Sequence, residues 1–255
     1  MRPILFHAFG FGFGSARVFA GLAALASYLV FESRRKELAL SDDDFWGLMG
    51  ALALGTILGA IVFYAIAYGS GLAANLSYWR ARRDIAGGSM LGAWAGAAAA
   101  AALFCRRKAK PFGPAADALG AAAPLGLAVM RVGCLLNGCC FGKPTTLPWG
   151  ITFNVPSAVP QALRGKPLHP AQLYEAAAAL LIFEAVRRCS HPRGPLASGR
   201  GLLLSAGLYG AARFAIDFLR GGDIGIVAPL GLSVAQWVCA AVALFAAARL
   251  ARRTA

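Results

Sequence analysis

The chain has 255 residues, of which 58% are hydrophobic and only 14% are charged, and its mean hydropathy is +0.62. Soluble domains average about 45–50% apolar and about 25% charged residues, so this composition excludes an ordinary soluble protein and indicates an integral membrane protein. The net charge of +14 does not indicate a nucleic-acid-binding protein, because the basic residues form short clusters beside apolar segments, as membrane topology signals do.

Seven apolar segments of about membrane-spanning length follow one another along the chain. Their long stretches of Ala, Leu and Gly show no strand-like alternation, which favours helices over a barrel. The segments are approximately Gly14–Phe31, Phe45–Tyr68, Gly88–Phe104, Ala115–Leu136, Pro170–Val186, Gly201–Leu219 and Leu232–Leu250. The sequence therefore predicts an all-α membrane protein, a seven-transmembrane-helix bundle, as one domain over residues 1–255.

The distribution of Lys and Arg predicts how this bundle is oriented. Fourteen lie in the connections after the odd-numbered segments and at the C-terminal end, against eight on the opposite side. Because basic residues accumulate in cytoplasmic loops, we expect a periplasmic N-terminus and a cytoplasmic C-terminus. The one long connection, at about residues 138–169, then lies at the outer face, and a short strand is predicted within it at Ile151–Val155.

The segment from Met130 to Gly142 places Arg131 inside an otherwise apolar helix, followed by Asn137 and by cysteines and glycines. A charged side chain costs a few kcal/mol or more in hydrocarbon and therefore usually marks a functional site. The alternative is an arginine near a helix end that extends its guanidinium to the interface.

The sixth segment carries Tyr209, Arg213, Asp217 and Arg220 at spacings that keep all four on one helical stripe. Either this stripe is an ion-pair network that packs helices together, or Arg213 and Arg131 face a common cavity. Two buried guanidinium groups suit a phosphate, which they bind through pairs of charge-assisted hydrogen bonds. The prediction is a site for a phospholipid of the outer leaflet.

The fifth segment opens with H-P-A-Q-L-Y-E, in which Gln172 and Glu175 share one helical face. His169 is a candidate general base, with helix capping as the alternative. Cys134, Cys139 and Cys140 form the pattern C-x4-C-C. Packing of small buried thiols is favoured there, with a disulfide or a metal site as alternatives.

These motifs resemble the prolipoprotein diacylglyceryl transferase family. The resemblance covers most of the chain and rests on R-V-G-C-L-L-N-G-C-C-F-G-K-P-T, on H-P-A-Q-L-Y-E and on Y-G-A-A-R-F-A-I-D-F-L-R-G-G-D. It implies a multi-pass enzyme of the bacterial inner membrane, in lipoprotein biosynthesis, that moves a diacylglyceryl group from phosphatidylglycerol to the lipobox cysteine of a prolipoprotein signal peptide. It implies no metal and no cofactor.

The resemblance also implies roles for individual residues. The expected catalytic residues are Arg131, Arg213, His169 and Asp217, with the two arginines on the headgroup phosphate. The expected substrate-binding residues are Asn137, Gly142, Gln172, Tyr174, Glu175, Tyr209 and Arg220.

The chain departs from the family pattern at four positions. Cys134 stands in place of an asparagine, Cys139 and Asp217 in place of glutamates, and Ala86 in place of a histidine. These changes support an alternative interpretation, a paralog that binds or moves phospholipid without transfer, or one that uses its three clustered cysteines for thiol or metal chemistry.

Overall fold

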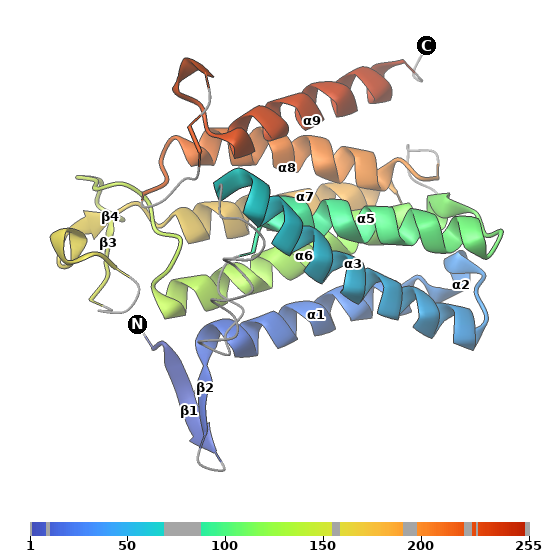
Figure 1. Ribbon diagram of the computed structural model, residues 1–255, viewed down its shortest axis with the longest axis horizontal. Coiled ribbons are helices and arrows are strands. Elements are labelled where there is room, and N and C mark those ends of the chain that lie inside the picture. Colours follow the sequence, from blue (N-terminus) through green and yellow to red (C-terminus); the bar gives the residue numbers. More distant parts are fainter. Residues whose placement is uncertain are drawn as a thin grey trace.

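The computed structural model describes residues 2–8, 11–68, 88–154, 159–190, 198–221, 226–227 and 229–252. Within these residues the helices run lengthwise through an elongated bundle (Figure 1). They are α1 (Ser15–Ser33), α2 (Arg35–Leu38), α3 (Asp42–Tyr68), α5 (Met90–Arg107), α6 (Phe112–Asn137), α7 (Ala171–Cys189), α8 (Gly201–Asp217) and α9 (Val234–Ala251).

Each predicted apolar segment corresponds to one long helix of the described chain. Four of these helices, α1, α3, α6 and α9, are long and apolar enough to cross a membrane by length and composition. The helical membrane architecture is therefore confirmed, whereas the count of seven spans and their orientation stay predictions.

The described residues also form two small sheets outside the helical bundle. The first is a hairpin of β1 (Ile4–Ala8) and β2 (Phe11–Gly14), which was not predicted from the sequence. Two strands of four or five residues are too short to give a clear periodic signal beside a long apolar helix. The second sheet pairs β3 (Ile151–Thr152) with β4 (Pro167–Leu168). The strand predicted at Ile151–Val155 is therefore confirmed for its first two residues, which form β3.

Glycines let α3 and α5 approach each other closely. A side chain on Gly59 would collide with the carbonyl of Gly92, and a side chain on Gly92 would collide with the carbonyl of Gly59. Gly55 and Gly96 form a second pair of this kind one turn away. Small residues at such positions permit backbone contact between helices in a membrane, where no hydrophobic driving force pulls helices together.

α6 lies at the centre of the bundle and packs against α1, α5, α7 and α8. At the end of the bundle where α5 ends and α6 begins, buried Asp117 accepts hydrogen bonds of 2.7 Å from the backbone N–H groups of Gly199 and Gly201. These groups lie at the start of α8. A carboxylate is stabilised there by the helix dipole and by backbone N–H groups that have no partner within the helix. Asp117 therefore fixes α8 against α6.

The opposite end of the bundle gathers the end of α6, the start of α7, the end of α8 and the start of α9 (Figure 1). The long connection covers this end, with a small core of Phe141, Phe153, Val159 and Leu168 and a short 3-10 turn, η1 (Gln161–Leu163). A second 3-10 turn, η2 (Pro229–Gly231), precedes α9. Backbone hydrogen bonds of 2.8 Å, from Gly142 to His169 and from Lys143 to Leu219, tie the connection to α7 and α8.

Candidate active site

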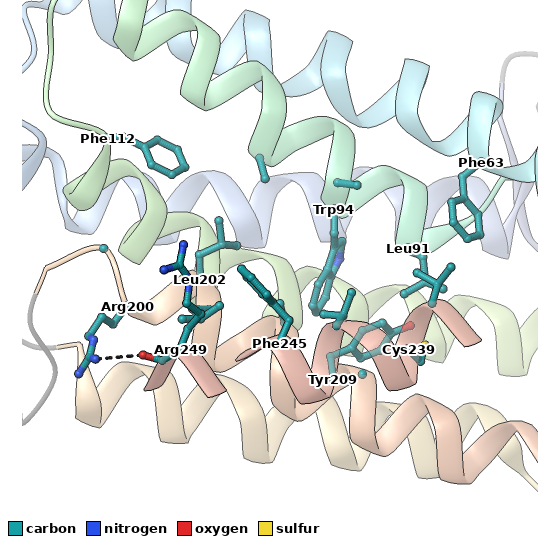
Figure 2. Close-up of a pocket in the computed structure, with 18 of the residues that line it drawn as sticks. Phe63, Leu91, Trp94, Phe112, Arg200, Leu202, Tyr209, Cys239, Phe245 and Arg249 are labelled. Atoms are coloured by element: carbon teal, nitrogen blue, oxygen red, sulfur yellow. Dashed lines mark hydrogen bonds between the residues drawn. The ribbon is translucent and has the colours of Figure 1, made fainter. Parts of the chain in front are cut away.

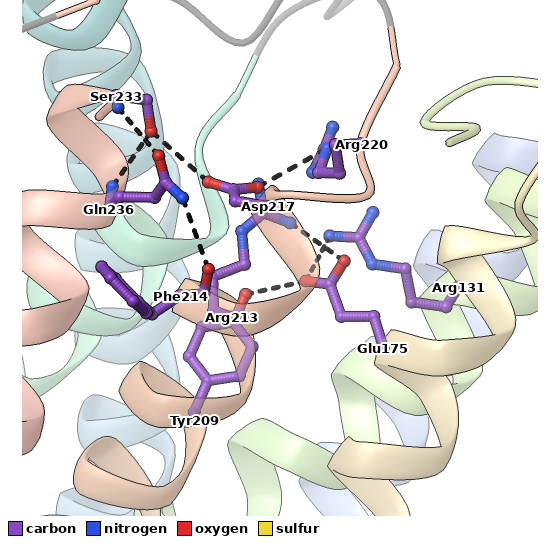
Figure 3. A network of polar contacts seen from close by, with 9 residues as sticks. All are labelled: Arg131, Glu175, Tyr209, Arg213, Phe214, Asp217, Arg220, Ser233 and Gln236. Carbon is purple, nitrogen blue, oxygen red and sulfur yellow. Dashed lines mark hydrogen bonds and ion pairs between the residues drawn. The ribbon is translucent and has the colours of Figure 1, made fainter. Parts of the chain in front are cut away.

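The carboxylate of Glu175 joins three helices at this end of the bundle (Figure 3). Its Oε1 accepts hydrogen bonds from Arg131 Nη2 at 2.8 Å and from the Tyr209 hydroxyl at 2.9 Å. Its Oε2 accepts one from Arg213 Nη1 at 3.0 Å. Arg131 comes from α6, Glu175 from α7, and Tyr209 and Arg213 from α8. The exposed fractions of Glu175, Arg131 and Tyr209 are 2%, 6% and 3%, so the cluster is shielded from bulk solvent.

Asp217 extends this network towards α9 (Figure 3). Its Oδ1 lies 2.8 Å from Arg213 Nη2 and 3.8 Å from Arg220 Nε, so Asp217 forms ion pairs with both arginines. Its Oδ2 accepts a 3.5 Å hydrogen bond from the hydroxyl of Ser233. Ser233 and Gln236 form a capping box at the start of α9. The polar network therefore holds four helices in register.

The network has an excess of positive charge. Three guanidinium groups (Arg131, Arg213 and Arg220) face two carboxylates (Glu175 and Asp217), which leaves a formal charge of +1. An uncompensated charge in a low-dielectric environment is costly, and an anionic ligand removes that cost. The arrangement therefore favours binding of one monoanion.

A cavity of about 690 Å³ opens onto this network. Its wall includes Arg131, Asn137, Arg213, Asp217 and Arg220, and Arg17 of α1 also lines it. The buried Nε of Arg131 has no hydrogen-bond partner among the described residues. A buried donor without a partner is rare and costs free energy, so it marks a position for an acceptor atom of a ligand.

Two apolar cavities adjoin the polar one. The first, of about 620 Å³, lies between α5, α8 and α9 and shares Phe63, Leu91 and Tyr209 with the polar cavity (Figure 2). The second, of about 520 Å³, lies among α1, α3, α5 and α6 and shares Met90 and Met130 with it. The combined shape suits a molecule with one anionic head and two apolar chains.

His169 lies away from the arginine cluster. Its Nδ1 is 3.2 Å from the hydroxyl of Tyr174, which also accepts a 2.8 Å hydrogen bond from Trp149 Nε1. Among the described residues, the lining of the polar cavity includes neither His169 nor Tyr174. These two predicted site residues thus lie together, but beside the long connection rather than at the arginines.

Gly142 and Gln172 position the backbone next to the site. Gln172 is fully buried and donates a 2.7 Å hydrogen bond to the carbonyl of Cys139. A side chain on Gly142 would collide with His169 and with the carbonyl of Leu219. Both residues therefore fix the path of the chain after α6, whereas Asn137 lines the cavity itself.

Two features of this end of the bundle were not predicted from the sequence. Helical periodicity placed Glu175 on one face with Gln172 but did not identify it as the shared partner of both arginines. The available sequence signal was a single carboxylate near the start of an apolar helix, in a chain whose other apolar helices carry arginines. Ser233, whose hydroxyl contacts Asp217, was given no role.

The three cysteines of the C-x4-C-C pattern also converge at this site. The Sγ atoms of Cys134, Cys139 and Cys140 all lie within 4.8 Å of one another. Cys134 is buried, the other two are half-buried, and all three line the polar cavity. Arg131 Nη1 lies 3.6 Å from the Cys134 sulfur, which connects the cysteines to the charged network.

The fold and the cavity define a helical membrane protein with a buried basic site that opens into a cavity of about 690 Å³. The chain belongs to the prolipoprotein diacylglyceryl transferase family, whose model matches residues 3–252. Similar proteins carry the name phosphatidylglycerol–prolipoprotein diacylglyceryl transferase. One from Clostridium tetani is 30% identical over 91% of each chain. One from Aromatoleum aromaticum is 34% identical over 86% of this chain and 84% of its own, and one from Geobacter sulfurreducens is 33% identical over 83% and 77%.

Proposed function

We propose that this protein transfers the diacylglyceryl group of phosphatidylglycerol to the lipobox cysteine of prolipoprotein signal peptides, at the outer face of the bacterial inner membrane. The observation that carries the proposal is the buried network with its formal charge of +1, which opens into a cavity flanked by two apolar cavities. Phosphatidylglycerol has a monoanionic phosphodiester and two acyl chains, so its charge and shape match the site.

In this mechanism Arg131 and Arg213 bind the phosphate, and Glu175 holds their guanidinium groups in place. The acceptor sulfur attacks the glycerol carbon that carries the phosphate oxygen. A carbon–sulfur bond forms, the carbon–oxygen bond breaks, and glycerol phosphate leaves with the bonding electrons. Negative charge on the phosphate increases in the transition state, where preorganised guanidinium groups stabilise it more than in the ground state.

The thiol proton requires an acceptor near the phosphate. Asp217 lines the cavity, and its Oδ1 has no hydrogen-bond donor among the described residues, although Arg213 lies close enough for an ion pair. His169 lies outside the cavity lining. Of the two expected catalytic residues other than the arginines, Asp217 is therefore the one that we place in the reaction as the base.

A second candidate function is phospholipid binding without transfer. Cys134 and Cys139 favour this second function, because they occupy positions where the family pattern has an asparagine and a glutamate. A neutral thiol does not replace a carboxylate as an acceptor for arginine. The fourth departure, Ala86, lies outside the described residues.

The test uses the purified full-length protein in phosphatidylglycerol-containing proteoliposomes with a lipobox peptide. We expect a peptide whose mass increases by one diacylglyceryl group, together with released glycerol phosphate. A peptide with serine in place of its cysteine is the matched control. Phosphatidylglycerol binding without either product would support the second candidate and refute the transferase.

The orientation is tested separately in cells. Single cysteines introduced into the connection at residues 143–150, in a variant without native cysteines, should react with a membrane-impermeant thiol reagent from the periplasmic side. A cysteine near Lys108, between α5 and α6, should react only after the cells are permeabilised. The reverse pattern would contradict both the orientation and the outer-face site.

A further inference from the structure

We propose that Cys134, Cys139 and Cys140 bind one thiophilic divalent metal ion, such as Zn²⁺, whose fourth coordination position faces the phosphate cavity and takes the acceptor thiol. The mechanistic half of this inference rests on the proposed transferase function. The metal site itself rests on the arrangement of the three sulfurs.

The spacing of the sulfurs is close to that of a metal–thiolate site. Zinc–sulfur bonds of about 2.3 Å place the sulfurs of one ion about 3.8–4.0 Å apart. The three Sγ atoms here all lie within 4.8 Å of one another. Side-chain rotations that move each sulfur by less than about 1 Å would complete the geometry.

The backbone after α6 is folded so that the three side chains converge. Gly138 takes a left-handed conformation with φ of 77°, and the N–H group of Cys139 closes the turn on the carbonyl of Cys134 at 3.1 Å. Cys140 is also left-handed, with φ of 62°, which side-chain-bearing residues rarely adopt. Gln172 holds this turn from α7 through its 2.7 Å hydrogen bond to the carbonyl of Cys139. A strained residue held in this way is a common feature of ligand sites.

The surrounding charges suit a metal–thiolate complex. Three thiolates and one divalent ion have a formal charge of −1. Arg131 Nη1 lies 3.6 Å from the Cys134 sulfur, and Arg220 lines the same cavity. The guanidinium groups of Arg131 and Arg220, which would repel a bare cation, attract this complex. Arg17, a further guanidinium on the same cavity wall, adds formal positive charge beyond the +1 of the network that faces the phosphate. Soft sulfur donors without oxygen ligands select Zn²⁺ and similar ions over Mg²⁺ or Ca²⁺.

Three protein ligands leave the fourth tetrahedral position of such an ion open, as in catalytic zinc sites. All three cysteines line the cavity that holds Arg131, Arg213 and Asp217. A substrate thiol at the open position would bind as a thiolate, because a coordinated thiol loses its proton. That proton passes to Asp217 and then to solvent. The bound sulfur forms the bond to the glycerol carbon as glycerol phosphate departs, and the neutral thioether product is a weak ligand that dissociates.

Metal binding is tested on reduced, chelator-treated full-length protein in detergent, with Co²⁺ as the probe. We expect one Co²⁺ per chain with sulfur-to-cobalt charge-transfer absorption, and protection of three thiols from alkylation as measured by mass spectrometry. Cys139→Ala and Cys140→Ala should each lose this absorption. Cys105→Ala and Cys189→Ala, which change cysteines elsewhere in the bundle, should keep it.

Several outcomes would overturn the metal site. These are the absence of charge-transfer absorption when the thiols are reduced, an unchanged spectrum in the Cys139 and Cys140 variants, and a Cys134 disulfide that persists in the isolated protein while the reduced protein binds no Co²⁺. Alkylation protection is measured on the wild-type chain, so it stays informative if a variant fails to fold.

Activity measurements separate this inference from the proposed function. Chelation should lower transfer at least tenfold without loss of phosphatidylglycerol binding, and Zn²⁺ should restore it. Transfer that is independent of metal and cysteines would refute the inference and leave the transferase standing. A metal-loaded protein that binds lipid but never transfers would refute the transferase, and the metal site would remain.

Discussion

Replacing Glu175 with glutamine tests whether one buried carboxylate holds both arginines in place. The change keeps the side-chain size but removes the negative charge that accepts hydrogen bonds from Arg131, Tyr209 and Arg213 at 2.8–3.0 Å. The formal charge of the network rises from +1 to +2, and the new amide N–H₂ group faces donors. Removing one partner of a buried ion pair costs roughly 3–5 kcal/mol. That loss is a large part of a typical free energy of unfolding of about 5–15 kcal/mol.

Thermal unfolding in mixed micelles measures this loss. We expect the melting temperature of Glu175→Gln to fall by on the order of 10 °C in neutral phosphatidylcholine micelles. The fall should be smaller in phosphatidylglycerol micelles, because the lipid phosphate supplies the missing negative charge. Transfer activity should drop at least about tenfold, since the guanidinium groups lose their common anchor.

Glu184→Gln is the matched control, because Glu184 lies on the same helix but pairs with Arg187 and Arg188 at the partly exposed end of α7. Its melting temperature and activity should change little, since exposed ion pairs are screened by solvent. The double variant Glu175→Gln/Arg131→Gln restores the formal charge of +1 and should recover part of the stability but no activity. A Glu175→Gln protein with wild-type melting temperature and wild-type transfer would show that this carboxylate does not organise the arginines.

Three further predictions concern the arginines, the base and the helix anchor. Arg131→Lys and Arg213→Lys should each lower transfer roughly 10- to 100-fold, because lysine cannot form the paired hydrogen bonds to phosphate; full activity in both would contradict the phosphate clamp. Asp217→Asn should abolish most transfer while His169→Gln keeps most of it, as measured by the initial rate with a lipobox peptide; the opposite order would make His169 the base. Asp117→Ala should lower the free energy of unfolding by about 1–2 kcal/mol without changing transfer per folded molecule, and a selective loss of transfer would show that Asp117 does more than cap α8.

The sequence alone determined the helices and identified two arginines, Arg131 and Arg213, within apolar segments. Hydropathy is a short-range property, so each predicted apolar segment corresponds to a helix. The cost of a charge in an apolar helix was enough to identify Arg131 and Arg213 from their sequence context. Their joint presence also predicted an anionic ligand.

Only the tertiary structure decided which side chains meet. Glu175 contacts Arg131 and Arg213 across 44 and 38 residues of sequence, a pairing that depends on the rotation of α6, α7 and α8 about their axes. Likewise, the C-x4-C-C spacing does not distinguish packing from a ligand set, because the convergence of the three sulfurs depends on two left-handed residues in the turn after α6. His169 lies beside Tyr174 rather than beside the arginines because the long connection, not the helix, sets where its ring lies. Local sequence patterns predict individual helices and strands. The contacts between helices depend on how distant segments pack, which no short stretch of sequence specifies.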